Sequence, residues 1–196
     1  YVLGAPEVLT SALGPAQGAW QAMAREWTGK GQRVLLFAYL PQLVALSGAD
    51  GQARLPAGLV PLGLVAFTDE LRPDARATLD GFRQAGIQVK IISGDSPHTV
   101  AALARQAGLE DGAEPRVISG PELAALDEAQ FALAAREAAI FGRITPEQKQ
   151  RLVRALRDHG HYVAMTGDGV NDVLALKQAK LSIAMQSGTP AARNVA

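Results

Sequence analysis

Short apolar runs alternate with amphipathic segments after residue 60, and this alternation constrains the fold more than any other feature of the chain. Each apolar run has the length of a strand. Each segment that follows repeats its apolar residues at three- and four-residue spacing, as a helix does. Strands and helices in alternation form βαβ units, in which helices cover a parallel sheet. We therefore predict an α/β fold with a Rossmann-like parallel sheet.

The pattern places strands at 59–67, 87–93, 115–120, 138–144, 161–165 and 181–185, and helices at 74–86, 97–108, 121–137, 145–160 and 170–180. The run at 59–67 is apolar almost throughout, which predicts a buried strand. The clearest helix start is at Thr145, because a proline follows directly and Gln148 stands three residues on, in capping-box spacing.

Residues 1–68 lack this regular alternation and form a separate predicted domain, with a helix expected at 15–31 and a strand at 33–40. We place the domain boundary near Asp69, so that residues 69–196 form the second domain. Because the chain does not begin with methionine, we expect it to be a fragment of a longer protein.

The composition excludes several functional classes. Lysine plus arginine equals aspartate plus glutamate at 19 each, and no basic patch is visible, so we predict no nucleic-acid partner. No apolar run approaches the roughly 20 residues that a membrane helix needs. Hydrophobic residues make up 48% of the chain, which is enough for a packed core. The absence of cysteine excludes disulfides, thiolate metal sites and cysteine nucleophiles.

Ligands of open α/β sheets bind beyond the carboxyl ends of the strands, and TGDGVND at 166–172 is the richest polar segment there. Asp168 follows an expected strand, and Asp172 lies one helical turn further on. Neighbouring carboxylates repel each other unless a cation lies beside them, and Mg²⁺ usually takes one or two carboxylates plus a phosphate. The pair predicts a magnesium site; the alternative is a pair of helix-capping carboxylates.

Two further segments are expected at the same edge of the sheet. Ser93, Gly94 and Asp95 offer a hydroxyl and backbone N–H groups to phosphate oxygens, although the same residues suit an ordinary turn. Lys149 lies in the first turn of the helix expected at 145–160. Helical side chains lean toward the N-terminus, so the ammonium group can reach a phosphate there. An exposed lysine without a function is the alternative.

These groups can position and neutralise a phosphoryl group, but none of them is an obvious nucleophile. Asp69 follows the apolar run at 59–67 and is the available candidate. Leu71 stands where a phosphatase would carry its second acid/base group, and no phosphate-binding turn follows Asp69. The sequence therefore predicts machinery for phosphoryl transfer without its nucleophile.

Together these motifs resemble the haloacid dehalogenase superfamily and, within it, the P-type cation-transporting ATPases. TGDGVND resembles the hinge signature of that family, SGD at 93–95 its T-G-D, and GRITPEQK at 142–149 its R-x-x-P-x-x-K. DELRPDA at 69–75 resembles its D-P-P-R segment. LGAPE at 3–7 and GQRVLLFAY at 31–39 resemble segments of its nucleotide-binding domain. The likeness covers essentially the whole chain in the order of the family.

The resemblance implies that 1–68 is the C-terminal part of an α+β nucleotide-binding domain. It implies that 69–196 is a phosphorylation domain of haloacid dehalogenase type, without the N-terminal strand that carries the nucleophilic aspartate. The string D-K-T-G-T of that strand does not occur here. The implied protein is a multi-pass membrane ATPase with this chain at the cytoplasmic face. Its partners would be ATP, a cation bound only by the membrane part, and the remainder of the polypeptide.

The resemblance also assigns roles to single residues. Asp168 would ligate Mg²⁺, and Asp172 would support the metal through water or hydrogen bonds. Lys149, Ser93 and Asn171 would act on the transferring phosphoryl group. The residues implied to contact ATP are Gly4, Arg33, Asp69, Arg72, Ser93, Gly94, Asp95, Arg143, Lys149 and Asn171.

The sequence departs from the family pattern at several positions. Leu3 replaces the usual lysine, which removes a cation from the adenine pocket, and Leu174 replaces the proline of N-D-x-P-A-L. The string NDVLAL suggests a calcium-related bacterial branch. Two alternatives remain at this point: a free-standing phosphatase that uses Asp69, and a non-catalytic nucleotide-binding module. The second lacks the third glycine of G-x-G-x-x-G, since Asp172 occupies that place.

Overall fold

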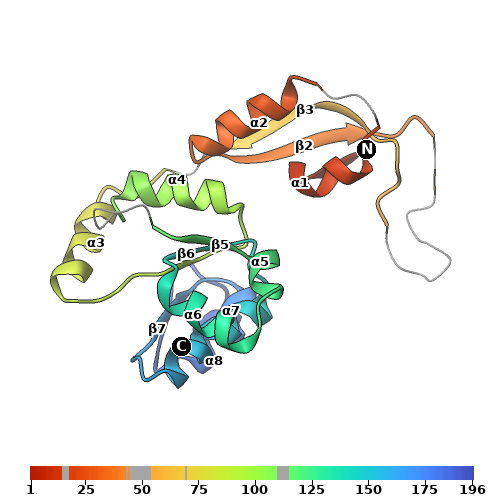
Figure 1. The fold of residues 1–196 in the computed structure, drawn as a ribbon. Helices are drawn as coiled ribbons and strands as arrows, with labels where there is room; N and C mark the ends of the chain where they lie inside the picture. Colours follow the sequence, from red (N-terminus) through yellow and green to blue (C-terminus); the bar gives the residue numbers. More distant parts are fainter. Residues whose placement is uncertain (15–17, 43, 45–53, 69, 110–114) are drawn as a thin grey trace. The chain divides into compact units, whose positions relative to one another are not determined.

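The structure is a computed structural model that describes residues 1–14, 18–42, 44, 54–68, 70–109 and 115–196 (Figure 1). The chain divides into two compact units, Tyr1–Arg72 (unit 1) and Pro73–Ala196 (unit 2). Asp69, the predicted domain boundary, lies outside the described residues. None of the helices in the described part of the chain combines the length and apolar character needed to span a bilayer.

An antiparallel sheet with the strand order β1-β2-β3 forms the centre of unit 1. Its elements are β1 (Val2–Gly4), α1 (Pro6–Leu9), η1 (Thr10–Ala12), α2 (Trp20–Gly29), β2 (Arg33–Tyr39) and β3 (Val60–Phe67). Burial alternates along β2, as expected for a strand with one face in a core. Leu36 and Ala38 point into that core, where they pack with Leu9 of α1.

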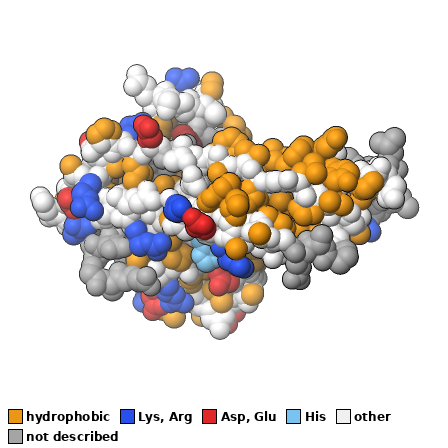
Figure 2. Space-filling model, turned by 90° about the horizontal axis from the view of Figure 1, so that it is seen from above, with side chains coloured by type: hydrophobic (Ala, Val, Ile, Leu, Met, Phe, Trp, Pro, Cys, Tyr) orange, Lys and Arg blue, Asp and Glu red, His pale blue; other side chains and the backbone are white. Residues whose placement is uncertain are grey.

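The opposite face of this sheet is apolar and open. The register pairs Leu3 with Phe37 and places Val65 on the same face, and Leu3, Val65 and Phe67 are exposed. Tyr1 stacks on Phe37 with ring centroids 5.5 Å apart. Hydrophobic side chains form a broad area in Figure 2. The prediction of a buried strand at 59–67 is therefore wrong, because successive side chains of β3 alternate between an exposed face and a face that is only half-buried against the core of unit 1.

Two parallel sheets, with the strand orders β4-β6-β5 and β7-β8, form unit 2. The strands are β4 (Ile91–Ile92), β5 (Val117–Ser119), β6 (Ile140–Gly142), β7 (Ala164–Gly167) and β8 (Leu181–Ala184). The helices are α3 (Ala75–Gln84), α4 (Pro97–Ala107), α5 (Gly120–Ala124), α6 (Glu128–Glu137), α7 (Pro146–Asp158), η2 (Val170–Asp172), α8 (Val173–Gln178) and α9 (Pro190–Arg193). The predicted α/β class with parallel pairing is confirmed.

Helix α7 packs against the cores of both sheets of unit 2. Leu152 lies in a cluster with Phe141 of β6, and Val153 lies in a second cluster with Met165 of β7. The predicted capping box at its start is confirmed: Gln148 N–H donates to Thr145 Oγ1 over 3.3 Å, and Thr145 N–H donates to Gln148 Oε1 over 3.1 Å. These bonds fix the residue at which α7 begins, and therefore the position of Lys149 in its first turn.

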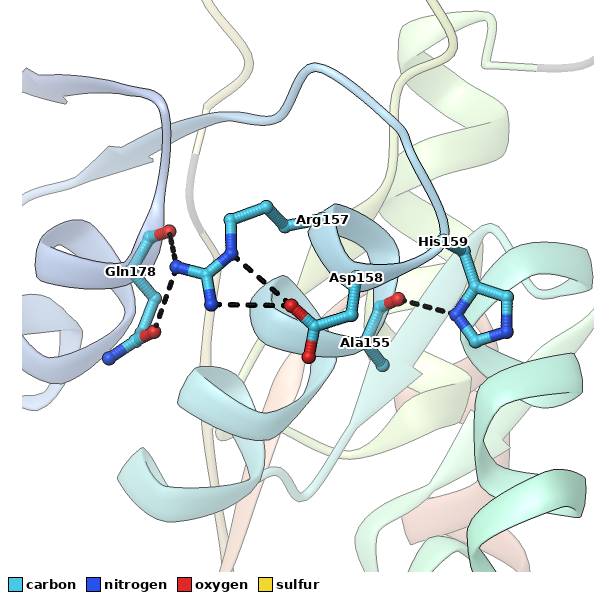
Figure 3. Close-up of polar contacts among 5 residues, drawn as sticks. All are labelled: Ala155, Arg157, Asp158, His159 and Gln178. Carbon is cyan, nitrogen blue, oxygen red and sulfur yellow. Dashed lines mark hydrogen bonds and ion pairs between the residues drawn. The ribbon is translucent and has the colours of Figure 1, made fainter.

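The far end of α7 is fixed to α8 (Figure 3). Arg157 donates from Nη1 to the carbonyl oxygen and to Oε1 of Gln178, both over 3.2 Å. Gln178 is the last residue of α8, so a cation satisfies a carbonyl at the helix C-terminus, where positive charge is favoured. His159 completes the end of α7, with Nδ1 2.8 Å from the carbonyl oxygen of Ala155.

Several predicted elements differ from the observed ones. The helix predicted at 121–137 is two helices, because Asp127 starts α6 with a capping box whose other partner is Gln130. The strand predicted at 87–93 pairs only at Ile91–Ile92. The strand predicted at 161–165 runs instead from Ala164 to Gly167, because the ladder with β8 begins at Leu181. Thr166 and Gly167 thus belong to the strand and not to the turn.

Candidate functional site

Asp172 is the most heavily bonded side chain of the candidate site. Its Oδ1 accepts a hydrogen bond from Lys149 Nζ over 2.6 Å. Its Oδ2 accepts from the backbone N–H groups of Asp168 and Gly169, both over 3.1 Å. Gly167 makes room for this arrangement, since a Cβ there would lie 2.6 Å from Asp172 Cβ. Both carboxylate oxygens are therefore engaged within the protein.

These contacts keep Asp172 ionised. Burial works to raise the pKa of the carboxyl, but the hydrogen bond and charge of Lys149 and the two N–H donors outweigh it and hold the pKa below its ordinary value. Lys149 has three N–H donors, of which one goes to Asp172, so two can serve a phosphoryl oxygen.

Asp168 differs from Asp172 in its surroundings. Its side chain is exposed, and its carboxylate forms no hydrogen bond or ion pair with the described part of the chain. Its backbone, in contrast, is held by the hydrogen bond from its N–H to Asp172. Asp168 therefore presents a carboxylate to solvent from a fixed backbone, at the carboxyl end of β7. Asp172 is the group that positions this backbone.

Hydrogen bonds join the segment after β4 to the segment after β6. Ile144 N–H donates to the carbonyl of Ser93 over 3.0 Å, and Arg143 N–H donates to that of Asp95 over 2.8 Å. Arg143 Nη1 donates to the carbonyl of Gly94 over 3.2 Å. The predicted SGD segment and the start of α7 are therefore neighbours at one edge of the sheet.

Ser93 also performs the ordinary turn role that the sequence left as its alternative. Its Oγ accepts a hydrogen bond from Asp95 N–H over 3.1 Å. A serine hydroxyl that accepts one bond still carries its own proton, which it can donate to a phosphate oxygen. The turn contact and a phosphoryl contact are compatible.

Arg143 has the left-handed backbone conformation, with φ at 54°, and is the single residue other than glycine with a positive φ in the described part of the chain. This conformation is unfavourable for residues with a Cβ, and strain of this kind collects at functional sites. Here it turns the chain from β6 toward α7, so that Arg143 can bond to Gly94 and Asp95.

The strain at Arg143 predicts a difference between two variants of that residue. Arg143→Gly should be more stable than Arg143→Ala by about 1 kcal/mol, because both lack the guanidinium group and only alanine is strained at a positive φ. Urea unfolding of the two variants measures the difference. Equal stability of the two would contradict a left-handed backbone at this position.

The remaining predicted residues are placed as follows. Asn171 is exposed in η2, close in sequence to the Asp168 backbone, and Arg72 is exposed at the end of unit 1. Arg33 lies on the open face of the unit 1 sheet, opposite Phe67. Gly4 lies on the buried face, where a Cβ would be 3.3 Å from Leu9 Cγ. Asp69 lies outside the described residues, so its predicted role has no geometry here.

The residues at the end of β7 fit Mg²⁺. The described residues contain no group of three or more histidine, cysteine, aspartate or glutamate side chains that could hold a metal ion. Mg²⁺ does not require one, since it keeps several waters and usually binds one or two carboxylates together with substrate phosphates. Asp168 supplies such a carboxylate, and Asp172 with Lys149 stands beside it.

Comparison with known proteins agrees with this geometry. A sequence model of the haloacid dehalogenase-like hydrolases matches residues 13–180, most of the chain. The chain belongs to the haloacid dehalogenase-like hydrolase family. Its parallel sheets and the polar groups at their carboxyl ends are what that family membership predicts.

Curated relatives place the chain within this family. A calcium-transporting ATPase CtpE of Mycobacterium bovis is 44% identical over the whole of this chain, which spans 23% of the relative. A probable cation-transporting ATPase exp7 of Streptococcus pneumoniae is 38% identical over 99% of the chain and 23% of the relative. Cation-transporting ATPase pma1 of Synechocystis is 39% identical over 90% of the chain and 20% of the relative. The resemblance to P-type ATPases is confirmed.

Sequence reasoning missed two glycines and one threonine that shape the site of this haloacid dehalogenase-like chain. Gly120 was read as the last residue of the strand predicted at 115–120, and Gly188 and Thr189 lie in a segment to which no element was assigned, yet each contacts the backbone of a predicted site residue. The only signal available was the Ser-Gly-Thr-Pro string at 187–190, which resembles a helix start and says nothing about its neighbours.

Proposed function

We propose that this chain is a catalytic portion of a longer ATP-driven cation transporter, which couples ATP hydrolysis through an aspartyl-phosphate to ion transport at the cytoplasmic face of a membrane. The contact that carries the proposal is the buried pair of Lys149 and Asp172, which also binds the backbone of Asp168. The pair supplies a cation, Lys149, for the phosphoryl group and positions a carboxylate, Asp168, for Mg²⁺ at the end of one strand.

The transfer itself requires a carboxylate that the longer polypeptide would supply. Its oxygen attacks the γ-phosphorus of ATP, the bond from that phosphorus to the bridging oxygen breaks, and ADP leaves. Water then attacks the acyl-phosphate, which releases phosphate and restores the carboxylate. In both steps Lys149 offers N–H donors and positive charge to the phosphoryl oxygens, and Ser93 offers its hydroxyl proton.

Magnesium would be held by Asp168, with Asp172 fixing that residue and Asn171 nearby, and it would neutralise charge on the phosphoryl oxygens. Nucleotide contact is proposed for Gly94, Asp95 and Arg143 in unit 2. In unit 1, Arg33 would contact ATP, with Gly4 in the adjoining strand. Arg72 and Asp69 would lie at the hinge of the two domains, 1–68 and 69–196.

Exposed apolar side chains support the view that further chain packs on this one. No residue of α3 is buried, and Phe82 of that helix is exposed. The open face of the unit 1 sheet is apolar as well. Monomeric proteins seldom leave broad apolar areas in contact with water. The exposed Phe82 and the open face of the unit 1 sheet are accounted for if this chain is part of a larger polypeptide.

Replacing Asp168 by alanine tests the proposed magnesium ligand. In the longer polypeptide, Asp168→Ala should weaken Mg²⁺ binding by more than about 100-fold, since even outer-shell changes cost 10–100-fold. Calorimetry measures the affinity, and the circular dichroism spectrum should not change because the side chain is exposed. The control is Asp74→Ala, because Asp74 is another exposed carboxylate whose side chain forms no hydrogen bond or ion pair with the described residues. Undiminished Mg²⁺ binding by Asp168→Ala would refute the assignment.

The chain by itself should neither hydrolyse ATP nor form an acyl-phosphate, because it lacks the proposed nucleophile. Robust Mg²⁺-dependent turnover that is lost in Asp69→Asn would contradict this and favour a free-standing phosphatase.

The names of the mycobacterial relatives make Ca²⁺ the first cation to test for stimulation of ATP hydrolysis by the longer polypeptide.

A further inference from the structure

The backbone of Asp168 is held from both sides. On one side its N–H donates to the carboxylate of Asp172 over 3.1 Å. On the other side its carbonyl oxygen accepts a hydrogen bond from Thr189 N–H over 2.7 Å. Thr189 belongs to the turn of residues 185–189, which connects β8 to α9. No role follows for this turn from the motifs at 93–95, 142–149 and 166–172.

The backbone of the turn packs closely against the backbone of Asp168. Gly188 is buried, and a Cβ at this position would lie 2.9 Å from the carbonyl oxygen of Asp168 and 3.1 Å from its Cα. The same Cβ would lie 2.9 Å from the carbonyl oxygen of Met185. These neighbours are backbone atoms and cannot swing aside, so any larger residue at 188 must displace Asp168 or the turn.

Both ends of the turn are anchored. Met185 N–H donates to the carbonyl of Gly167 over 3.0 Å, which extends the β7–β8 pairing to the residue before Asp168. Thr189 Oγ1 accepts from Ala192 N–H over 3.3 Å, and Ala192 is fully buried in the core beside Met165. The turn is thus attached to the sheet at one end and to the core at the other.

We propose that the 185–189 turn positions the magnesium ligand, with Gly188 and Thr189 as positioning residues for Asp168. The inference rests on the proposed function, in which Asp168 binds Mg²⁺. The carboxylate of Asp168 is exposed, so its place is set by its backbone. Mg²⁺ demands near-ideal octahedral geometry at short distances, so a shift of that backbone weakens binding even when the carboxylate is present.

Two substitutions in the longer polypeptide disturb the turn in different ways. Gly188→Ala introduces the Cβ, and Gly29→Ala, which meets no atom within 4 Å, is its control. Thr189→Pro removes the N–H donor, and its backbone suits proline because φ is −63°. Thr189→Ala is the reference for the proline variant, since both lack the hydroxyl and only alanine keeps the N–H.

Calorimetry should find Mg²⁺ binding weakened about 10-fold or more by Gly188→Ala and by Thr189→Pro relative to their references, the size of a lost outer-shell contact. The Mg²⁺ concentration for half-maximal ATP hydrolysis should rise in parallel, while excess Mg²⁺ restores much of the maximal rate. If the turn had only a structural role, the variants would contain less active protein, but the active protein would keep the wild-type Mg²⁺ affinity.

Wild-type Mg²⁺ affinity in both variants would overturn the inference, and so would a loss of fold in either one, which would assign the turn to folding. Asp168→Ala, measured alongside, separates this inference from the proposed function. If that variant loses Mg²⁺ while Gly188→Ala and Thr189→Pro bind normally, only the positioning role fails. If Asp168→Ala itself binds Mg²⁺ normally, the proposed function fails.

Discussion

Replacing Asp172 by asparagine is expected to lower the free energy of unfolding of the chain by about 3–5 kcal/mol, the usual cost of removing one partner of a buried ion pair. Lys149 Nζ lies 2.6 Å from Asp172 Oδ1, and the two side chains are only 12% and 9% exposed. A neutral amide leaves the lysine ammonium buried without a counter-charge. Urea unfolding followed by circular dichroism measures the loss.

The chain offers a matched control for this substitution. Lys30 and Glu26 form an ion pair of the same length, 2.6 Å, but their side chains are 62% and 60% exposed. Glu26→Gln should therefore cost less than about 0.5 kcal/mol, as exposed helix pairs do. If the two substitutions cost the same, burial is not what gives the Lys149–Asp172 pair its energy.

The same pair makes stability depend on acid pH. The folded pKa of Asp172 is held below its ordinary value of 3.8, because Lys149 and the two N–H donors outweigh the opposing effect of burial. The unfolded chain then binds the proton first as pH falls. The stabilisation is complete above the ordinary pKa and is lost as pH falls through the lower folded pKa. Below about pH 4 the stability gap between wild type and Asp172→Asn should therefore narrow.

The sequence predicted those parts of the fold that local signals determine. The start of α7 follows from Thr145, Pro146 and Gln148 alone, and the structure has the capping box that these residues indicate. Asp127 and Gln130 carry the same kind of signal, but the alanine-rich sequence around them favoured one continuous helix. The helix that carries Lys149 was predicted because its start is well defined, and this placed Lys149 at the same edge of the sheet as the carboxylates.

Contacts between distant segments were beyond the reach of the sequence. The pairing of Lys149 with Asp172 requires two helices to pack in one particular way, and no local pattern encodes that packing. The apolar run of β3 predicted a buried strand. Hydrophobicity alone does not show whether the surface that covers this strand belongs to the present chain or to another segment of the polypeptide. Gly188 and Gly120 gave no signal of their role, because the site atoms that they accommodate, the carbonyl oxygens of Asp168 and Arg143, come from distant segments of the chain.

Replacing Gly120 by alanine is the second large effect that we expect, with a loss of about 3 kcal/mol or more in the free energy of unfolding. A Cβ at Gly120 would lie 2.0 Å from the carbonyl oxygen of Arg143 and 2.8 Å from Gln148 Oε1. Neither neighbour can yield easily. Gln148 is engaged in the capping box of α7 and donates to the carbonyl of Gly120 over 2.8 Å. Arg143 is held in its left-handed conformation by bonds to the SGD segment.

The effect on function should follow the same contacts. A shift of the Arg143 carbonyl moves the start of α7, which carries Lys149, so Gly120→Ala should also reduce phosphoryl transfer by the longer polypeptide. Gly81→Ala is the control: Gly81 lies in the middle of α3 with no atom within 4 Å of its added Cβ. It should stabilise the chain by about 0.5–1 kcal/mol, because alanine favours a helix interior. Urea unfolding of both variants decides the matter. A Gly120→Ala chain within 1 kcal/mol of wild type would mean that β5 and the β6–α7 connection lie further apart than the structure has them.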